Sequence, residues 1–147
     1  MPIKTNARIG IVSLLLLSCL ALAAQDNPYT KYQGFYVIVG EKPKAFSGID
    51  NFVITEFNAD RLSGRVVPVE GRVYEFRSAK LADGSLTFET RRVNGVGYSF
   101  TGRFLSAPPA PKDGRTPVLE GTMKRLRDGA PPEEAKLRFA FSEGGGE

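Results

Sequence analysis

Short segments of alternating apolar and polar residues, divided by turn residues, run through this chain from Gly34 to Ser142. Alternation is the period of a half-buried β-strand, and no stretch has the three-to-four spacing of a long amphipathic helix. The pattern therefore predicts an all-β fold. We expect strands over Gly34–Val39, Asn51–Phe57, Leu62–Pro68, Arg72–Leu81, Ser85–Arg92, Val96–Leu105, Val118–Arg127 and Ala135–Ser142.

Three connections between neighbouring segments share one form, a triplet that ends in glycine. They are Val69-Glu70-Gly71, Ala82-Asp83-Gly84 and Val93-Asn94-Gly95. A three-residue hairpin loop with glycine in the left-handed position fits this form. At the third connection, such a loop sets Tyr98 opposite Thr90, whereas a two-residue Asn-Gly turn would set Tyr98 opposite Arg91, among the charges. We therefore predict three-residue loops.

The same loop length in the middle hairpin sets Glu75 opposite Arg91 on the outer face. It also sets Arg77 opposite Glu89 there. Alternate residues then face inward and collect on one apolar side. This inward set is Leu62, Gly64, Val66, Tyr74, Phe76, Ser78, Leu86, Phe88, Thr90, Tyr98, Phe100, Gly102, Phe104, Leu119, Gly121, Met123, Leu137, Phe139 and Phe141.

A meander with one apolar face must cover that face by closing into a barrel or by folding over as a sandwich. Short nearest-neighbour connections favour a single antiparallel up-and-down β-barrel of about eight strands, with a β-sandwich as the alternative. The inward glycines Gly64, Gly102 and Gly121 fit a tight barrel, because they permit sharp bending or close approach of backbones; the alternative is that they form β-bulges.

The first 24 residues have the organisation of a secretory signal peptide. Two basic residues precede an apolar run over 9–24 that ends in small residues suited to signal-peptidase cleavage. We expect a mature chain that begins near Gln25, is secreted or periplasmic, and keeps no transmembrane segment. The segment Leu16-Leu17-Ser18-Cys19 resembles the lipobox of bacterial lipoproteins, so a protein anchored through Cys19 is the alternative.

The mature chain is expected to form one domain. Residues 25–33 are a short N-terminal lead, residues 34–142 form the β-barrel, and residues 143–147 form a disordered glycine-rich tail. Two longer polar loops interrupt the barrel, a proline-rich one over 106–116 and another over 128–134.

The residue types of common enzyme sites are missing. The chain has no histidine, and its one cysteine lies in the predicted signal. The usual general bases, thiol nucleophiles and soft metal ligands are therefore absent, and we expect no catalytic residues, no cofactor and no metal site. Loss of the signal leaves 18 basic against 16 acidic residues, and the longest basic run is Arg91-Arg92. Such a mixed surface predicts no nucleic-acid partner.

Hydroxyl groups lie among aromatic side chains on the inward face, at Tyr74, Ser78, Thr90 and Tyr98. This mixture is typical of a pocket for a small, mostly apolar ligand, and equally of a filled barrel core. We therefore expect a monomeric, non-catalytic binding module for a small apolar ligand or a partner. The alternative is an envelope interaction or structural protein with a solid core, which uses its outer face or the 106–116 loop.

The segment Gly34-Phe35-Tyr36 at the start of the first strand resembles the Gly-x-Trp start of lipocalins, with tyrosine in place of the tryptophan. Lipocalins and avidins are exported eight-stranded barrels of similar size. The resemblance implies a lipocalin-like, or calycin-like, architecture, and no binding residues follow from it.

Overall fold

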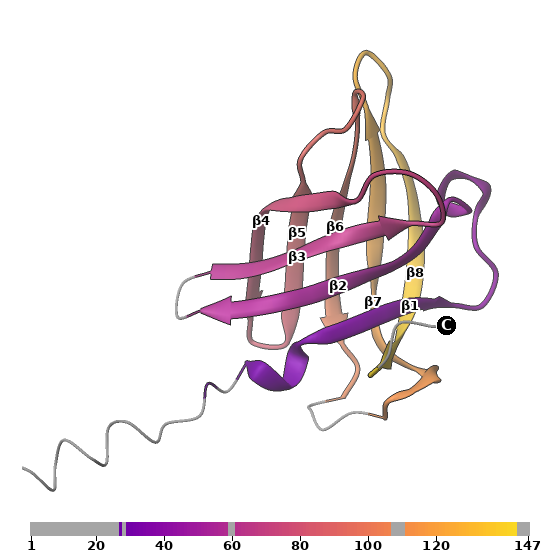
Figure 1. Cartoon of the computed structure of the whole chain (residues 1–147). Helices are drawn as coiled ribbons and strands as arrows, with labels where there is room; N and C mark the ends of the chain where they lie inside the picture. Colours follow the sequence, from indigo (N-terminus) through magenta and orange to yellow (C-terminus); the bar gives the residue numbers. More distant parts are fainter. Residues whose placement is uncertain (1–26, 28, 59–60, 107–110, 144–147) are drawn as a thin grey trace, which may run out of the picture.

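Eight antiparallel strands close into one barrel in the computed structural model, which describes residues 27, 29–58, 61–106 and 111–143 (Figure 1). Each strand pairs with the next, and the last pairs back to the first. The predicted all-β, up-and-down barrel is therefore confirmed. The strands are β1 (Gly34–Val39), β2 (Ile49–Asn58), β3 (Arg61–Pro68), β4 (Tyr74–Ala82), β5 (Ser85–Thr90), β6 (Val96–Phe104), β7 (Asp113–Arg127) and β8 (Glu133–Ser142).

The predicted signal peptide with Cys19 lies outside the described residues, as does nearly all of the predicted tail. Of that tail only Glu143 is described, and its carboxylate pairs with Lys112 Nζ at 2.6 Å. The predicted lead contains a short 3₁₀ helix, η1 (Thr30–Tyr32).

Aromatic rings fill the centre of the barrel. The ring of Phe52 stacks on Tyr36 at 4.7 Å and lies 5.2 Å from Phe88 and 5.0 Å from Phe139. Phe100 joins this cluster at 5.5 Å from both Phe88 and Phe139. Burying one such ring is worth about 1.5–3 kcal/mol, so these contacts form the main stabilising core of the fold.

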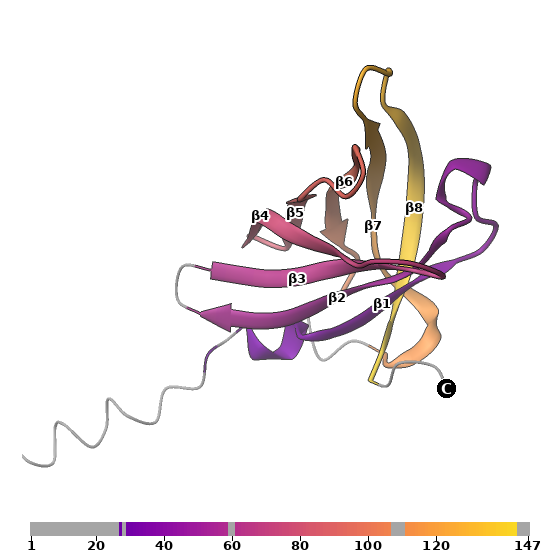
Figure 2. The ribbon, with the colours of Figure 1, turned by 45° about the horizontal axis from the view of Figure 1, so that its top comes forward.

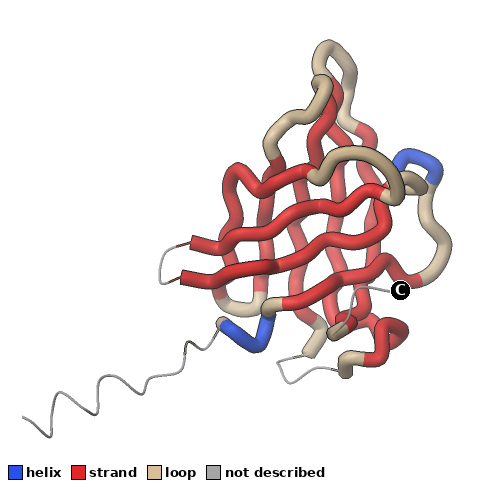
Figure 3. Tube along the Cα trace, in the orientation of Figure 1, coloured by secondary structure: helices blue, strands red, loops and turns tan. Residues whose placement is uncertain are grey.

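The two 3₁₀ helices lie at different ends of the barrel (Figure 3). At one end, the ring of Tyr32 in η1 packs 4.9 Å from Phe104, and the Tyr36 hydroxyl donates to the Tyr32 carbonyl oxygen at 2.6 Å. The second helix, η2 (Lys44–Phe46), lies in the β1–β2 connection and buries Phe46 in the core. We call this second end, where the chain also turns from β3 to β4, β5 to β6 and β7 to β8, the polar end.

Two of the three predicted hairpin loops are shorter than expected. Asp83 and Asn94 both have φ of 51°, and the glycines that follow them, Gly84 and Gly95, also have positive φ. Two successive left-handed residues define a two-residue type I′ turn, in which Asx-Gly is the preferred pair. The prediction of three-residue loops was wrong at these two connections, because an Asp-Gly or Asn-Gly pair fits both a two-residue and a three-residue hairpin loop.

A β-bulge in β4 restores the predicted register only in part of that strand. The pairing shifts between Phe76 and Ser78, so Phe76 lies opposite Thr90 as the predicted loop would place it. Between the turn and the bulge every side chain changes face. The prediction that Ser78 faces inward was therefore wrong: Ser78 is exposed, and Leu81 is buried instead.

The predicted outer-face pairs of this hairpin are present. Arg77 Nη2 lies 2.8 Å from Glu89 Oε1. The Arg91 amide donates to the Glu75 carbonyl oxygen at 2.8 Å, which sets these two residues side by side.

A second irregularity follows the Asn94-Gly95 turn. Val93 and Val96 exchange backbone hydrogen bonds across the turn, at 2.8 and 3.0 Å. Farther along the same pair of strands Phe88 lies opposite Phe100, as predicted. The residues between this turn and the paired part of β5 and β6 take up the one-residue difference in register, so the aromatic rings still face the barrel interior.

The inward glycines lie where backbones approach closely, as predicted. Gly102 and Gly121 face each other across β6 and β7. A Cβ atom on Gly121 would overlap the Thr101 carbonyl oxygen and lie 2.7 Å from the Phe100 ring. A Cβ atom on Gly64 would likewise overlap Phe76. A larger residue at these sites would force the strands apart.

Strands β3 and β4 share the fewest residue pairs of any two neighbouring strands. Only Arg65 with Glu75 and Val66 with Tyr74 are paired, whereas β6–β7 and β7–β8 have nine pairs each. Figures 1 and 2 show the cause: β4 first runs beside β3 and then bends away beside β5. We call this incompletely paired boundary the β3–β4 seam. The predicted triplet Val69-Glu70-Gly71 is part of a longer connection over 69–73.

Strand β7 begins earlier than predicted. Asp113 through Thr116 belong to it, so the predicted 106–116 loop is shorter, and residues 107–110 lie outside the described part. The Asp113 carboxylate accepts hydrogen bonds from the Arg115 amide at 2.8 Å and from the Thr116 amide and hydroxyl at 2.7 and 2.6 Å. Hydrogen bonds from the Thr116 side chain and then from backbone amides lower the pKa of Asp113 to about 2.

Candidate ligand site at the polar end

Three of the four residues predicted to bind a ligand meet at the polar end. The rings of Tyr74 and Tyr98 lie 5.0 Å apart in an edge-to-face arrangement. Thr90 is buried, and its Oγ1 accepts a hydrogen bond from the Tyr98 amide at 2.9 Å. Ser78 is not part of this group, because the bulge turns it to the outer face.

Two charged residues that were not predicted complete the group. Arg125 lies opposite Tyr98 across β6 and β7, and Glu133 lies opposite Arg125 across β7 and β8. Both continue the inward positions of their strands, since Met123 lies two residues before Arg125 and is fully buried. Extending the inward set by one alternating position along β7 and β8, with charged residues allowed, would have predicted both.

The charged groups at this end are close but not in hydrogen-bond contact. Arg125 Nη1 lies 3.7 Å and Arg127 Nη2 lies 3.5 Å from the same Glu133 Oε2 atom. Direct charge-assisted hydrogen bonds are about 2.7–2.9 Å long. Within the described residues, neither the buried Glu133 Oε2 nor the buried Arg125 Nε has a hydrogen-bond partner. The cluster therefore has unused hydrogen-bonding capacity.

Tyr98 keeps its proton in this setting. Burial is the main effect that raises the pKa of its hydroxyl, and Tyr74 and Glu133 act in the same direction, while the charge and hydrogen bond of Arg125 oppose them. A neutral phenol at pH 7 can donate a hydrogen bond to a ligand.

The arrangement combines aromatic surface with donors. Arg92 and Asp128, 4.0 Å apart at the rim, add one charge of each sign. Three guanidinium groups thus accompany two carboxylates, an excess of one positive charge. Such a site can bind the apolar part of a molecule against the rings and orient an acidic group.

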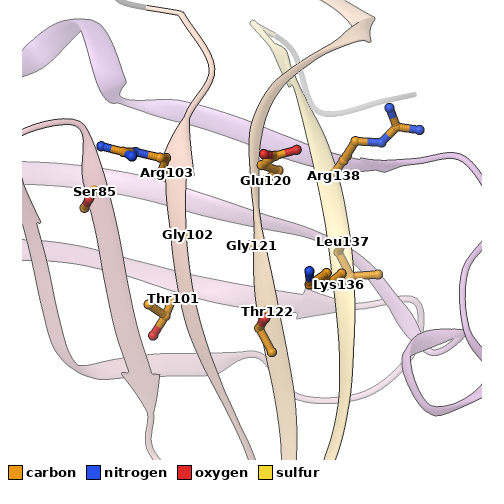
Figure 4. Close-up of a pocket in the computed structure, with 10 residues that line it drawn as sticks. All are labelled: Ser85, Thr101, Gly102, Arg103, Glu120, Gly121, Thr122, Lys136, Leu137 and Arg138. Atoms are coloured by element: carbon orange, nitrogen blue, oxygen red, sulfur yellow. The ribbon is translucent and has the colours of Figure 1, made fainter.

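A hollow lies on the outer face over β5–β8 (Figure 4). Its lining includes Gly102, Gly121 and Leu137 and the charged residues Arg103, Glu120, Lys136 and Arg138. Figure 4 shows Arg103 extending away from Glu120, so these groups spread over the surface instead of converging. The hollow suits a broad contact better than a small ligand.

Comparison with protein families, curated proteins and solved structures found no match for this chain. The likeness to lipocalins expected from Gly34-Phe35-Tyr36 stays a prediction. In the part of the chain that the structure describes, no helix has the length and apolar character needed to cross a membrane.

Proposed function

We propose that this protein is an exported, non-catalytic binding module that holds a small ligand at the polar end of the barrel. The apolar part of the ligand lies against Tyr74 and Tyr98, and an acidic group of the ligand lies against Arg125 and Arg127. The observation that carries this proposal is the pair of guanidinium groups that face one carboxylate oxygen at distances too long for hydrogen bonds. A ligand oxyanion would supply the missing acceptors.

The filled centre of the barrel supports a ligand at the end of the barrel instead of deep inside it. Phe88, Phe100 and Phe139 occupy the middle. The ring centroid of Phe100 lies 5.5 Å from each of the other two, so the rings are in direct contact. On β5 and β6, Thr90 and Tyr98 lie two residues nearer the polar end than Phe88 and Phe100. The ligand therefore rests on the core without replacing it.

The first test is intact mass spectrometry of the exported protein, purified without stripping bound molecules, under native and denaturing conditions. We expect a native mass that exceeds the denatured mass by one discrete small molecule. The denatured mass also reports whether the chain begins near Gln25, as export through a cleaved signal requires. Equal native and denatured masses, together with no binding of an aromatic carboxylate such as benzoate, would overturn the ligand proposal.

The second test is a titration of isotope-labelled protein with benzoate, which carries a ring and a carboxylate, against benzamide, which keeps the ring and lacks the charge. We expect benzoate alone to shift the amide signals of Gly97, Tyr98 and Leu126 in magnetic resonance spectra. Arg125→Met should remove the shifts. Lys124→Met is the matched control, because Lys124 is the adjacent residue and pairs with Glu134 on the outer face at 3.7 Å.

The alternative function, an envelope interaction protein with a solid core, has separate support in the outer hollow of Figure 4. Arg103, Lys136 and Arg138 give its rim a positive balance against Glu120. Crosslinking in the exporting cell tests it: Arg103→Glu with Arg138→Glu should abolish a crosslinked product that Arg125→Met leaves intact. An unchanged product would count against this surface.

A further inference from the structure

The second half of β4 has a strand partner on one side only. Residues Ser78–Ala82 pair with β5, and no strand within the described residues pairs with their other edge. In Figure 1 this stretch of β4 forms the outer margin of the sheet made by β4–β8, and in Figure 2 β3 diverges from it. A free edge of this kind presents a row of backbone donors and acceptors to a further strand.

The turn geometry identifies which backbone groups face the free edge. Ala82 and Ser85 close the two-residue Asp83-Gly84 turn, so the backbone groups of Ala82 point toward β5. Because successive residues of a strand point their backbone groups to opposite sides, those of Leu81 and Ala79 point toward the free edge. Their side chains face the barrel interior, so an added strand would meet backbone and not apolar side chains.

The surroundings of this edge are basic. Lys80 on β4 and Arg61 and Arg65 on β3 are exposed, and no ion pair involves any of the three within the described residues. Arg77 is exposed too and is paired with Glu89. Glu75, opposite Arg65, is the one acidic residue paired across the seam. With Asp83 in the adjoining turn counted as well, four positive charges stand against three negative charges at the seam and its edge, an excess of one positive charge.

We propose that the free edge of β4 binds an extended acidic peptide segment of a partner protein as an added β-strand. Backbone hydrogen bonds to Ala79 and Leu81 supply the register, and acidic side chains of the peptide face Lys80, Arg61 and Arg65. The proposal is independent of the polar-end ligand, because the two sites share no residue.

A second copy of this chain fits the edge poorly. Antiparallel pairing of β4 with itself, centred on Ala79, would set each Lys80 opposite Ser78 of the other copy and diagonal to the other Lys80. Like charges across neighbouring strands are destabilising. The bulge and Lys80 therefore act against self-association, which is the usual role of bulges and charged residues on edge strands. A strand with acidic side chains would instead be attracted by the same positive charges.

Fluorescence anisotropy with designed peptides tests this. The probe is a labelled octapeptide that alternates glutamate and valine; the comparison peptides carry lysine for glutamate, or N-methyl valine that cannot donate to a ladder. We expect saturable binding of the acidic probe alone. Lys80→Glu should weaken that binding by about fivefold or more, whereas Lys124→Glu, three strands away on β7, should change it less than about twofold.

Hydrogen exchange separates strand addition from simple charge attraction. The acidic probe should slow exchange at the Ala79 and Leu81 amides and leave the Met123 amide unchanged. Equal binding of the N-methylated peptide, or no added protection at Ala79 and Leu81, would overturn the proposal. Binding should persist in Arg125→Met, so loss of the polar-end ligand and loss of the added strand are distinguishable outcomes.

Discussion

The wall formed by β6, β7 and β8 and the β3–β4 seam are both parts of one closed barrel, yet they are held together differently. The wall has nine residue pairs at each boundary, and the seam has two. In the wall, paired glycines let the backbones approach closely enough for continuous pairing. At the seam, a bulge directs β4 away from β3. Closure of this barrel therefore depends on side-chain packing at the seam and on backbone pairing in the wall.

The largest expected difference in unfolding free energy is between substitutions of two aromatic residues, one in the wall and one at the seam. Phe100 is 1% exposed and packs on Phe52, Phe88 and Phe139, whereas Phe76 is half-buried and stacks mainly on Phe88 at 4.3 Å. We expect Phe100→Ala to reduce the free energy of unfolding by about 4 kcal/mol and Phe76→Ala by about 2 kcal/mol. Urea unfolding measures both. Equal losses would mean that the seam is as closely packed as the wall.

Close backbone approach in the wall is tested by adding one methyl group. Gly121→Ala places a Cβ atom against the Thr101 carbonyl oxygen and the Phe100 ring, so we expect a loss of about 1–3 kcal/mol. Gly48→Ala is the matched control, because nothing lies within 4 Å of its added Cβ atom and its φ is not in the left-handed region. Its effect should stay below about 0.5 kcal/mol, measured in the same urea series. A tolerated Gly121→Ala would contradict the close approach.

The comparison also predicts uneven hydrogen exchange. Amides of Ala79 and Leu81 point to an unpaired edge, whereas the amide of Met123 lies in a strand paired on both sides. We expect exchange at Ala79 and Leu81 to be at least about tenfold faster, because no ladder bond must open first. Exchange rates resolved by residue measure this. Similar protection at all three sites would show that another part of the chain covers the edge.

Much of this barrel could be predicted from alternation alone. The predicted strand Gly34–Val39 coincides with β1, and the inward rings Phe88 and Phe100 meet as expected, because the two-residue period is a local property. Ser78 was misplaced because a turn one residue shorter and a compensating bulge leave the flanking pattern unchanged. Nothing in the sequence around Ser78 marks that bulge.

The candidate site was predicted only in part for a different physical reason. Tyr74, Thr90 and Tyr98 were found because hydroxyl groups among rings are conspicuous. Arg125 and Glu133 were missed because charged residues are normally expected on the solvent face, although the end of a barrel lets an inward position reach water. The meeting of five residues from five strands depends on the registers of the consecutive strands β4 to β8, which no local pattern shows.

The exposed ion pair beside the bulge should contribute little. Arg77 and Glu89 lie 2.8 Å apart with side chains 62% and 35% exposed. A double-mutant cycle with Arg77→Ala and Glu89→Ala should give a coupling free energy of about 0.2–1 kcal/mol, reduced by added salt. A coupling well above this range would show that the pair holds the bulge in place, and that the seam is stabilised by charge instead of packing.

The smallest effect is expected where the wall itself becomes irregular. The β7–β8 pairing shifts register twice between Asp113 and Leu119, and the Asp113 carboxylate holds the Thr116 segment there. Because hydrogen bonds from Thr116 and Arg115 lower the pKa of Asp113 from 3.8 to about 2, the charged form favours the folded state. Its contribution to stability should be fully present above about pH 4 and should disappear as the pH falls through about 2. Asp113→Asn should therefore be less stable than the parent protein at pH 6, and the difference should shrink toward pH 2, as followed by urea unfolding at each pH. A difference that does not depend on pH would mean that Asp113 acts by shape alone, and that the irregular start of β7 owes nothing to its charge.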